Sequence, residues 1–301
     1  MAQQKDMALT TFQKKFETNE DCRKHLFKYK WPEGYRCKQC GGRHYSYVST
    51  RKIYECNECH YQESAIANTV MHKSHTSLRK WFLALYLISH DKRGISATAL
   101  QKHIRVSYPT AWLMLHKIRN SMKLQDTKYQ LNNVIEMDEG FFGGQKRGGK
   151  RGRGTDKEKV VAEVSLNNKG KAQFAKLTDV PVLHASMLNQ IAIETIRKGS
   201  EIMTDGNRAY GGLEFAGFNH TTVKCAEQLH WLHIVISNAK TFLKGTYHGA
   251  CESKHYQRYL DEFCYRFNRR FWENQLFNRL LFACVSSSTI TYYELTHTEQ
   301  T

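Results

Sequence analysis

Four cysteines with regular spacing carry the clearest chemical signal in the sequence. Cys37 and Cys40 form one CxxC pair, Cys56 and Cys59 form a second, and fifteen residues separate the two pairs. Two such pairs can close four thiolates around one Zn²⁺ in a tetrahedral site. Disulfides are the alternative, but no secretory signal opens the sequence, and reducing cytosol disfavours them. We therefore expect a structural zinc ribbon, with His60 as a surface histidine.

Two aspartates form a second candidate site. Asp138 follows the strand-like residues 134–137, and Asp205 follows the short apolar pair 202–203. Ligands bind outside the strand ends of open α/β sheets, so the two carboxylates can converge there. Mg²⁺ binds through one or two carboxylates, and a pair of such ions supports in-line displacement at phosphorus. Either aspartate alone is equally typical of an ordinary turn.

The charge balance indicates a polyanionic partner. The chain has 45 Lys and Arg against 28 Asp and Glu, a net charge of +17. No apolar run approaches the roughly 20 residues that cross a bilayer, so nucleic acid is favoured over membrane. With 41% hydrophobic and 12% aromatic residues the chain can bury a core, and 301 residues suggest two or three units.

A group of predicted helices follows the ribbon. Residues 8–29 predict a short helical lead-in, and residues 77–90 predict an amphipathic helix. Ser96 can cap a second helix to Ile104, and a third follows a short turn and runs over residues 108–122. This order describes a helix-turn-helix unit that contacts DNA, although a plain helical bundle between two domains fits the same pattern. The residues that open the third helix and would enter a major groove are Ser107, Tyr108, Thr110 and Trp112.

Beyond residue 133 the periodicity becomes strand-like. Strands are predicted at 134–137, 160–164 and 171–177, then a helix at 187–196 and a short strand at 202–203. This order indicates an α/β domain with a mixed sheet.

A glycine-rich basic segment separates the first two of these strands. It runs from Gly143 to Gly154 and contains Lys146, Arg147, Lys150, Arg151 and Arg153. Such a loop can follow a phosphate backbone, but it is equally typical of a solvated loop. The same two interpretations apply to Arg266, Arg269 and Arg270 near the C-terminus.

Seven motifs together give a resemblance to a known family. In chain order they are GYRCKQC, YECNEC, GISATALQKHIRVSYPTAWLMLHKIR, IEMDEGFFGG, TDGNRAY, HIVISNAKTFLKGTYHG and YLDEFCYRFNRR. The chain resembles the ISXO-like transposases of bacterial insertion sequences, which are related to the Merlin group of DDE transposases. The resemblance covers residues 10–285. It implies an RNase H-like catalytic domain that cuts double-stranded DNA at the element's terminal inverted repeats and joins the ends to target DNA.

The resemblance also implies site residues. Asp138 and Asp205 match the first two acidic positions and would hold Mg²⁺ or Mn²⁺. No glutamate lies in the helix expected for the third position, and two ways of counting place it at Asn238 or at Ser237. We choose Asn238, with Lys244 as the downstream lysine of the branch that has asparagine.

The chosen third residue bears on activity. Asn238 offers a carbonyl oxygen without charge, so it would hold a second cation less tightly than glutamate does. Glu136 and Glu139 flank Asp138, and we expect strand alternation to point both away from its face. A catalytically inactive or regulatory zinc-containing DNA-binding protein is therefore the alternative function.

The expected organisation has five parts. They are a helical lead-in (1–33), a zinc ribbon (34–62), a helix-turn-helix region (76–124), a mixed-sheet α/β catalytic domain (132–286) and a tail (287–301). The family further implies a homo-oligomer on DNA, in the bacterial cytoplasm at the nucleoid.

Overall fold

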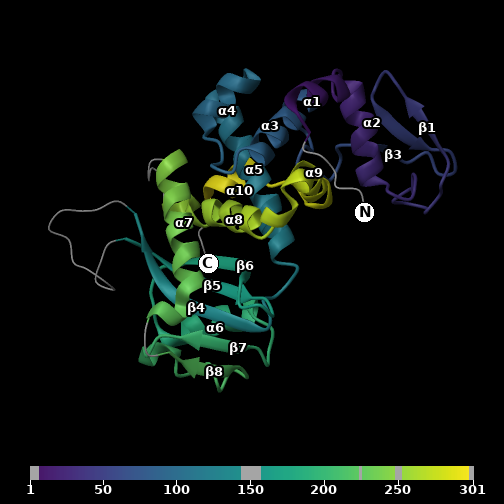
Figure 1. Ribbon diagram of the computed structural model, residues 1–301. Coiled ribbons are helices and arrows are strands. Elements are labelled where there is room, and N and C mark those ends of the chain that lie inside the picture. The colour runs from purple at the N-terminus through teal and green to yellow at the C-terminus, as the bar shows by residue number, and fades with distance from the viewer. Residues whose placement is uncertain (1–6, 144–156, 224–225, 248–252, 298–301) are drawn as a thin grey trace. The chain divides into compact units, whose positions relative to one another are not determined.

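The computed structural model describes residues 7–143, 157–223, 226–247 and 253–297. The chain divides into two compact units (Figure 1). Unit 1 consists of Met1–Met122 and Trp272–Thr298, and unit 2 of Lys123–Phe271 and Glu299–Thr301. Unit 1 contains the four cysteines of the two CxxC pairs, and unit 2 contains both aspartates. No helix in these described ranges is both long enough and apolar enough to cross a membrane.

Two short helices form the predicted lead-in of unit 1. Helix α1 (Leu9–Lys15) is followed by α2 (Asn19–Lys30). Thr18 separates them, because its side chain accepts a hydrogen bond from the backbone N–H of Asp21 while the Asp21 carboxylate accepts from the N–H of Thr18. This reciprocal pair is a capping box, which starts α2 at a defined residue.

The ribbon itself is a small antiparallel sheet. Strand β1 (Tyr45–Val48) pairs with β2 (Ile53–Cys56), and β2 pairs with β3 (Gln62–Ser64). Lys30 of α2 donates to the Glu63 carboxylate and to the Ser64 carbonyl, each at 2.8 Å, and so ties helix to sheet. The aromatic side chains between them form ring contacts, as expected for a miniature core: Phe27, Trp31, Tyr35, Tyr45 and Tyr54.

Three longer helices follow in unit 1. They are α3 (Leu78–His90), α4 (Ala97–Ile104) and α5 (Tyr108–Asp126), the last of which continues into unit 2. Ser96 caps α4 as predicted, since its hydroxyl accepts from the N–H of Ala99 at 3.1 Å. Arg105 adopts a left-handed conformation with φ of 50° and ends α4 abruptly. The tight turn between α4 and α5 therefore exists as expected.

Unit 1 is completed by the C-terminal part of the chain. Helix α9 (Leu276–Ser286) packs against α2 and α3, and α10 (Tyr292–His297) follows it. The predicted end of the catalytic domain at residue 286 is therefore too late, because residues 272–286 supply core to unit 1. Phe277 contacts Phe12 and Phe16 in that core, which explains why so distant a segment belongs there.

Unit 2 is built on a five-stranded mixed sheet in the order β6-β5-β4-β7-β8 (Figure 1). The chain pairs β4 antiparallel to β5 and β5 antiparallel to β6, whereas β7 lies parallel to β4 and β8 parallel to β7. The bounds are β4 (Val134–Phe142), β5 (Glu158–Leu166), β6 (Ala172–Val180), β7 (Glu201–Thr204) and β8 (Asn219–Thr222). This is the mixed sheet of the expected RNase H-like domain.

Helices cover both faces of this sheet. On one face, α7 (His230–Tyr247) and α8 (Tyr256–Phe267) share a buried cluster with residues of β5 and β6. On the other face, α6 (Ala185–Thr195) and the short helix η2 (Arg208–Tyr210) share a second cluster with β4 and β7. Alternate residues of β4 therefore face two different cores.

Strand β4 is longer than predicted. We expected it to end at residue 137, but it continues to Phe142 because β5 pairs with it along its whole length. Asp138 therefore lies in the middle of a strand and not at its end. Gly140 causes no break, since Ile236 of α7 packs over it and would lie 3.4 Å from a Cβ added there.

Candidate functional site

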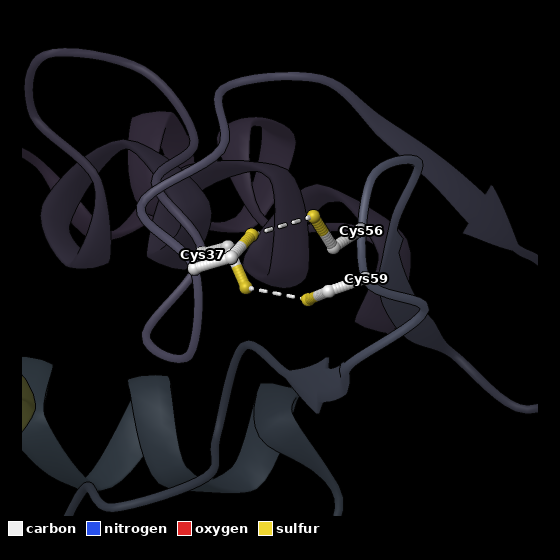
Figure 2. Close-up of side chains that lie close together, drawn as sticks. Cys37, Cys56 and Cys59 are labelled. Atoms are coloured by element: carbon white, nitrogen blue, oxygen red, sulfur yellow. Dashed lines mark hydrogen bonds between the residues drawn. The ribbon is translucent and has the colours of Figure 1, made fainter.

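The four cysteines of the CxxC pairs come together as predicted. Figure 2 shows sulfurs from the two knuckles facing each other. The Sγ atoms of Cys37 and Cys59 are 3.5 Å apart, and those of Cys40 and Cys56 are 3.6 Å apart. All four lie within 4.8 Å of one another. A disulfide requires about 2.05 Å, so the geometry is that of a metal site.

Local backbone geometry prepares these thiols for a cation. The N–H groups of Gln39 and Gly42 point at the sulfurs of Cys37 and Cys40, each at 3.4 Å. Burial raises the pKa of Cys37, but hydrogen bonds from backbone N–H groups bring it down to about 6, whereas contacts with neighbouring thiols and burial raise the pKa values of Cys40 and Cys59. His60 is exposed and lies beside Glu55, outside the group. Four sulfur donors with no open position fit a structural Zn²⁺.

Asp138 lies within β4, and Asp205 directly follows the last residue of the neighbouring parallel strand β7. Strand β4 pairs with β7 so that Glu136 lies opposite Met203, and each pair in this register differs by 67 in residue number. The same difference separates Asp138 from Asp205. Neighbouring strands lie about 4.8 Å apart, so this register, continued by two residues, brings the two aspartates close together at the carboxyl end of β7.

Both aspartates also belong to the face that α7 covers. Asp138 lies opposite Ala162, and Ala162 and Met203 both belong to the core beneath α7. Alternation places Asp205, two residues after Met203, on the same face. Each carboxylate is half-buried, and each has an oxygen that accepts a backbone N–H, at 2.7 Å for Asp138 and 3.0 Å for Asp205.

The expectation that Glu136 points away from Asp138 is wrong. Residues two apart in a strand share a face, so Glu136 lies on the side of Asp138 and under α7. Its side chain is buried, and its carboxylate accepts from the N–H of Leu232 at 2.6 Å. Burial raises the pKa of Glu136, and this hydrogen bond opposes the rise. Glu136 thereby attaches the first turn of α7 to the strand that carries Asp138.

Glu139 points to the opposite face, as expected. Its carboxylate accepts a hydrogen bond from the Tyr210 hydroxyl at 2.8 Å, and Tyr210 is buried in the core shared with α6. Burial and the charges of Glu139 and both aspartates raise the pKa of Tyr210. The hydrogen bond thereby ties Tyr210 to the strand that carries Asp138.

Helix α7 presents the third predicted position on its exposed side. Leu232, Val235, Ile236, Ala239 and Leu243 form its buried face. Ser237, Asn238 and Lys244 are all exposed, so burial does not distinguish the two alternatives for the third residue. His233 is also exposed and directly follows Leu232, the residue held by Glu136. Sequence reasoning did not select His233.

The start of α5 is organised by its own side chains. The Ser107 hydroxyl lies 2.9 Å from that of Thr110 and accepts from the Thr110 N–H at 3.4 Å. Tyr108 is exposed, whereas Trp112 is half-buried and contacts Tyr292. Of the residues predicted to enter a groove, Trp112 therefore contributes partly to packing.

The remaining basic candidates divide into two groups. The loop residues Lys146, Arg147, Lys150, Arg151 and Arg153 lie outside the described residues. The three C-terminal arginines make internal contacts: Arg266 pairs with Glu262, Arg269 with Asp126, and Arg270 donates to backbone carbonyls of β6. Contacts within the protein therefore account for these three arginines.

Two parts of the chain match known protein families. Residues 130–268 match the family described as ISXO2-like transposase domain, and residues 17–62 match the transposase zinc-ribbon domain. A protein in transposable element ISH50 of Halobacterium salinarum is 23% identical over 204 residues, which cover 63% of this chain and 68% of that protein.

Solved structures give weaker likenesses. A crystal structure of a pre-cleavage Mos1 transpososome aligns with 9% identity and a TM-score of 0.21, covering 70% of this chain and 79% of the other. A Mos1 mariner paired-end complex with Mn aligns with 10% identity and a TM-score of 0.23, covering 60% and 74%.

Proposed function

Because the chain belongs to the ISXO2-like transposases, we propose that it binds the terminal inverted repeats of its element and catalyses metal-dependent DNA strand cleavage and strand transfer. The observation that carries this proposal is the β4–β7 register, which, continued past Met203 to the residue after the end of β7, sets Asp205 opposite Asp138. Two half-buried carboxylates on adjacent strands repel each other unless a cation lies between them, and this arrangement suits Mg²⁺ or Mn²⁺.

Asp138 and Asp205 hold the cation in this proposal. When bound, a divalent cation stabilises the charge that develops on the attacking and leaving oxygens at phosphorus. The chain contributes the rest by orientation. Pairing with β5 fixes the backbone of Asp138, and the backbone N–H groups of Glu139 and Asn207 each hold one carboxylate oxygen, of Asp138 and of Asp205 respectively.

Asn238 and Lys244 of α7 complete the proposed site. Asn238 would supply an amide carbonyl to the cation, and Lys244 a positive charge to a DNA phosphate. Positions six apart on a helix point in different directions, so the two residues have separate roles. Both are exposed and therefore accessible to DNA.

Unit 1 is the proposed DNA reader. Zn²⁺ would hold the ribbon in shape, and Ser107, Tyr108 and Thr110 at the start of α5 would contact the inverted repeat. The basic segment at 146–153 would follow the backbone beside the cleaved bond. We further propose that the protein acts as a homo-oligomer on paired ends at the bacterial nucleoid, because two element ends must be cut and joined together.

A cleavage assay on DNA duplexes with the element's inverted repeat tests this function. Asp138→Asn and Asp205→Asn should each lower cleavage at least about a thousandfold, since a ligand worth several kcal/mol is lost. DNA affinity, measured by gel shift in the same buffer, should stay within a few-fold. Binding without cleavage by the unaltered protein in either Mg²⁺ or Mn²⁺ would instead favour a regulatory DNA-binding protein.

The same assay assigns the third position. Asn238→Ala should abolish cleavage, whereas Asn238→Glu should retain it. Ser237→Ala should have little effect. His233→Ala is the informative comparison, because His233 is the exposed neighbour of the helical residue that Glu136 holds. Loss at His233 with normal cleavage by Asn238→Ala would contradict the assignment of Asn238.

A further inference from the structure

A chain of hydrogen bonds connects Asp205 to the strand of Asp138 on the face away from α7. The Asp205 carboxylate accepts from the N–H of Asn207, and the Asn207 side chain accepts from the N–H of Ala209, both at 3.0 Å. The N–H of Tyr210 then donates to the Asn207 carbonyl at 3.1 Å. The segment from Asp205 to Tyr210 is thus a closed series of turns.

Two kinds of contact hold Tyr210, the last residue of this segment. Its ring is fully buried among residues of β4, β7 and α6. Its hydroxyl donates to the Glu139 carboxylate at 2.8 Å, and Glu139 is the residue directly after Asp138. The hydrogen bond therefore joins the segment that begins with Asp205 to the backbone that carries Asp138.

Pairing between β4 and β7 ends before the two aspartates. The last paired residues are Glu136 of β4 and Met203 of β7, and both aspartates lie two positions beyond them. Pairing with Ala162 of β5 holds Asp138, so the position of Asp205 relative to it depends on contacts made by the segment after β7. Tyr210 supplies such a contact, because its hydroxyl reaches Glu139, the residue next to Asp138.

We propose that Tyr210 is a positioning residue whose hydrogen bond to Glu139 sets the separation of Asp138 and Asp205 and thereby the affinity of the site for a divalent cation. This inference rests on the proposed function, because it assumes that the two aspartates bind the cation. Burial and the neighbouring carboxylates raise the pKa of Tyr210, so its hydroxyl stays a proton donor at working pH. A neutral hydroxyl can donate to Glu139 without adding another negative charge to a place that already holds carboxylates.

Mn²⁺ affinity of the zinc-loaded, full-length protein tests the proposal, with free Mn²⁺ measured by electron paramagnetic resonance. Tyr210→Phe removes one oxygen and should weaken Mn²⁺ binding about tenfold, at the lower end of losses for residues that orient metal ligands. In the Glu139→Ala background the hydroxyl has lost this partner, so Tyr210→Phe should cost no further affinity.

Tyr247→Phe is the matched control. Tyr247 is also a buried tyrosine of unit 2 whose hydroxyl donates to a glutamate, Glu262, at 3.3 Å. Its removal should lower the unfolding midpoint as Tyr210→Phe does but leave Mn²⁺ affinity unchanged. A purely structural role of Tyr210 would make the two variants alike in both measurements.

The outcomes distinguish failure of the positioning role of Tyr210 from failure of the proposed cation site. If Asp138→Asn abolishes Mn²⁺ binding while Tyr210→Phe binds as Tyr247→Phe does, the positioning role is refuted and the site stands. An equal loss from Tyr210→Phe in the presence and absence of Glu139 also refutes it. If Asp138→Asn binds Mn²⁺ normally, the proposed site fails and the inference fails with it.

Discussion

The register of the parallel strands β4 and β7, continued two residues beyond Glu136 and Met203, sets Asp138 opposite Asp205, although 67 positions separate them along the chain. The chain continues differently after each: β4 runs on past Asp138 to Phe142, whereas the chain turns directly after Asp205 into η2. Glu136 and Glu139 then connect the first strand to α7 on one face and to η2 on the other. Strand β4 therefore organises the whole candidate site.

Zinc removal should abolish DNA recognition. Cys40→Ser removes one of four sulfurs that lie within 4.8 Å of one another, and structural zinc contributes on the order of 10 kcal/mol to such small domains. We expect loss of bound zinc, measured by inductively coupled plasma mass spectrometry, together with loss of the gel shift. Cys22→Ser, a buried cysteine of α2 outside the cluster, should keep one zinc per chain. A Cys40→Ser protein with full zinc content would contradict the assignment.

Glu136→Ala should loosen the first turn of α7. The variant leaves the buried N–H of Leu232 without its acceptor, which costs about 1–3 kcal/mol in urea unfolding. Glu136→Gln keeps an acceptor oxygen and should lose much less, and Glu201→Gln at the exposed start of β7 is the control. Equal stability of Glu136→Ala and the unaltered protein would show that this bond does not hold the helix.

Part of this arrangement was predictable. Glu136 and Asp138 share a face because they are two residues apart in a strand, so the sequence contains that relationship. The partner of Glu136 lies 96 residues away on α7, and only the folded register selects it. The contact between Tyr210 and Glu139 is of the same kind, because local pattern reveals a buried tyrosine but not which carboxylate it meets.

Boundaries were predicted less well than elements. The sequence predicted a first strand that ends at residue 137, whereas pairing with β5 carries β4 through Gly140 to Phe142. Likewise, α9 reads as a generic amphipathic helix, and its place in unit 1 depends on ring contacts of Phe277 with residues at the other end of the chain. The cysteine cluster was predictable because its spacing alone determines its geometry.

Glu163 should make unit 2 less stable as pH rises. This side chain is fully buried in β5, accepts from the Thr195 hydroxyl at 2.7 Å, and lies near the charge of Lys176. Burial raises the pKa of Glu163 to about 8, so its contribution is complete below the unfolded value near 4.5 and is lost as pH rises through 8.

Glu163→Gln should remove this dependence. The difference in unfolding free energy between variant and unaltered protein should grow by a few kcal/mol from pH 5 to pH 8, in favour of the variant. Comparing the two proteins cancels the slopes of Asp179 and Asp261, whose pKa values burial also raises. Parallel pH profiles in urea unfolding would show that Glu163 does not titrate in this range.

The central claim is that Asp138 and Asp205 bind the divalent cation that supports strand cleavage, and the metal preference of Asp205→Cys tests it most directly. A thiolate binds Mg²⁺ poorly and accepts softer metals better. The account predicts that Asp205→Cys loses cleavage in Mg²⁺ and regains part of it in Mn²⁺, so the ratio of the Mn²⁺ rate to the Mg²⁺ rate rises at least about tenfold. An unchanged ratio, with cleavage in Mg²⁺ as fast as that of the unaltered protein, would contradict it.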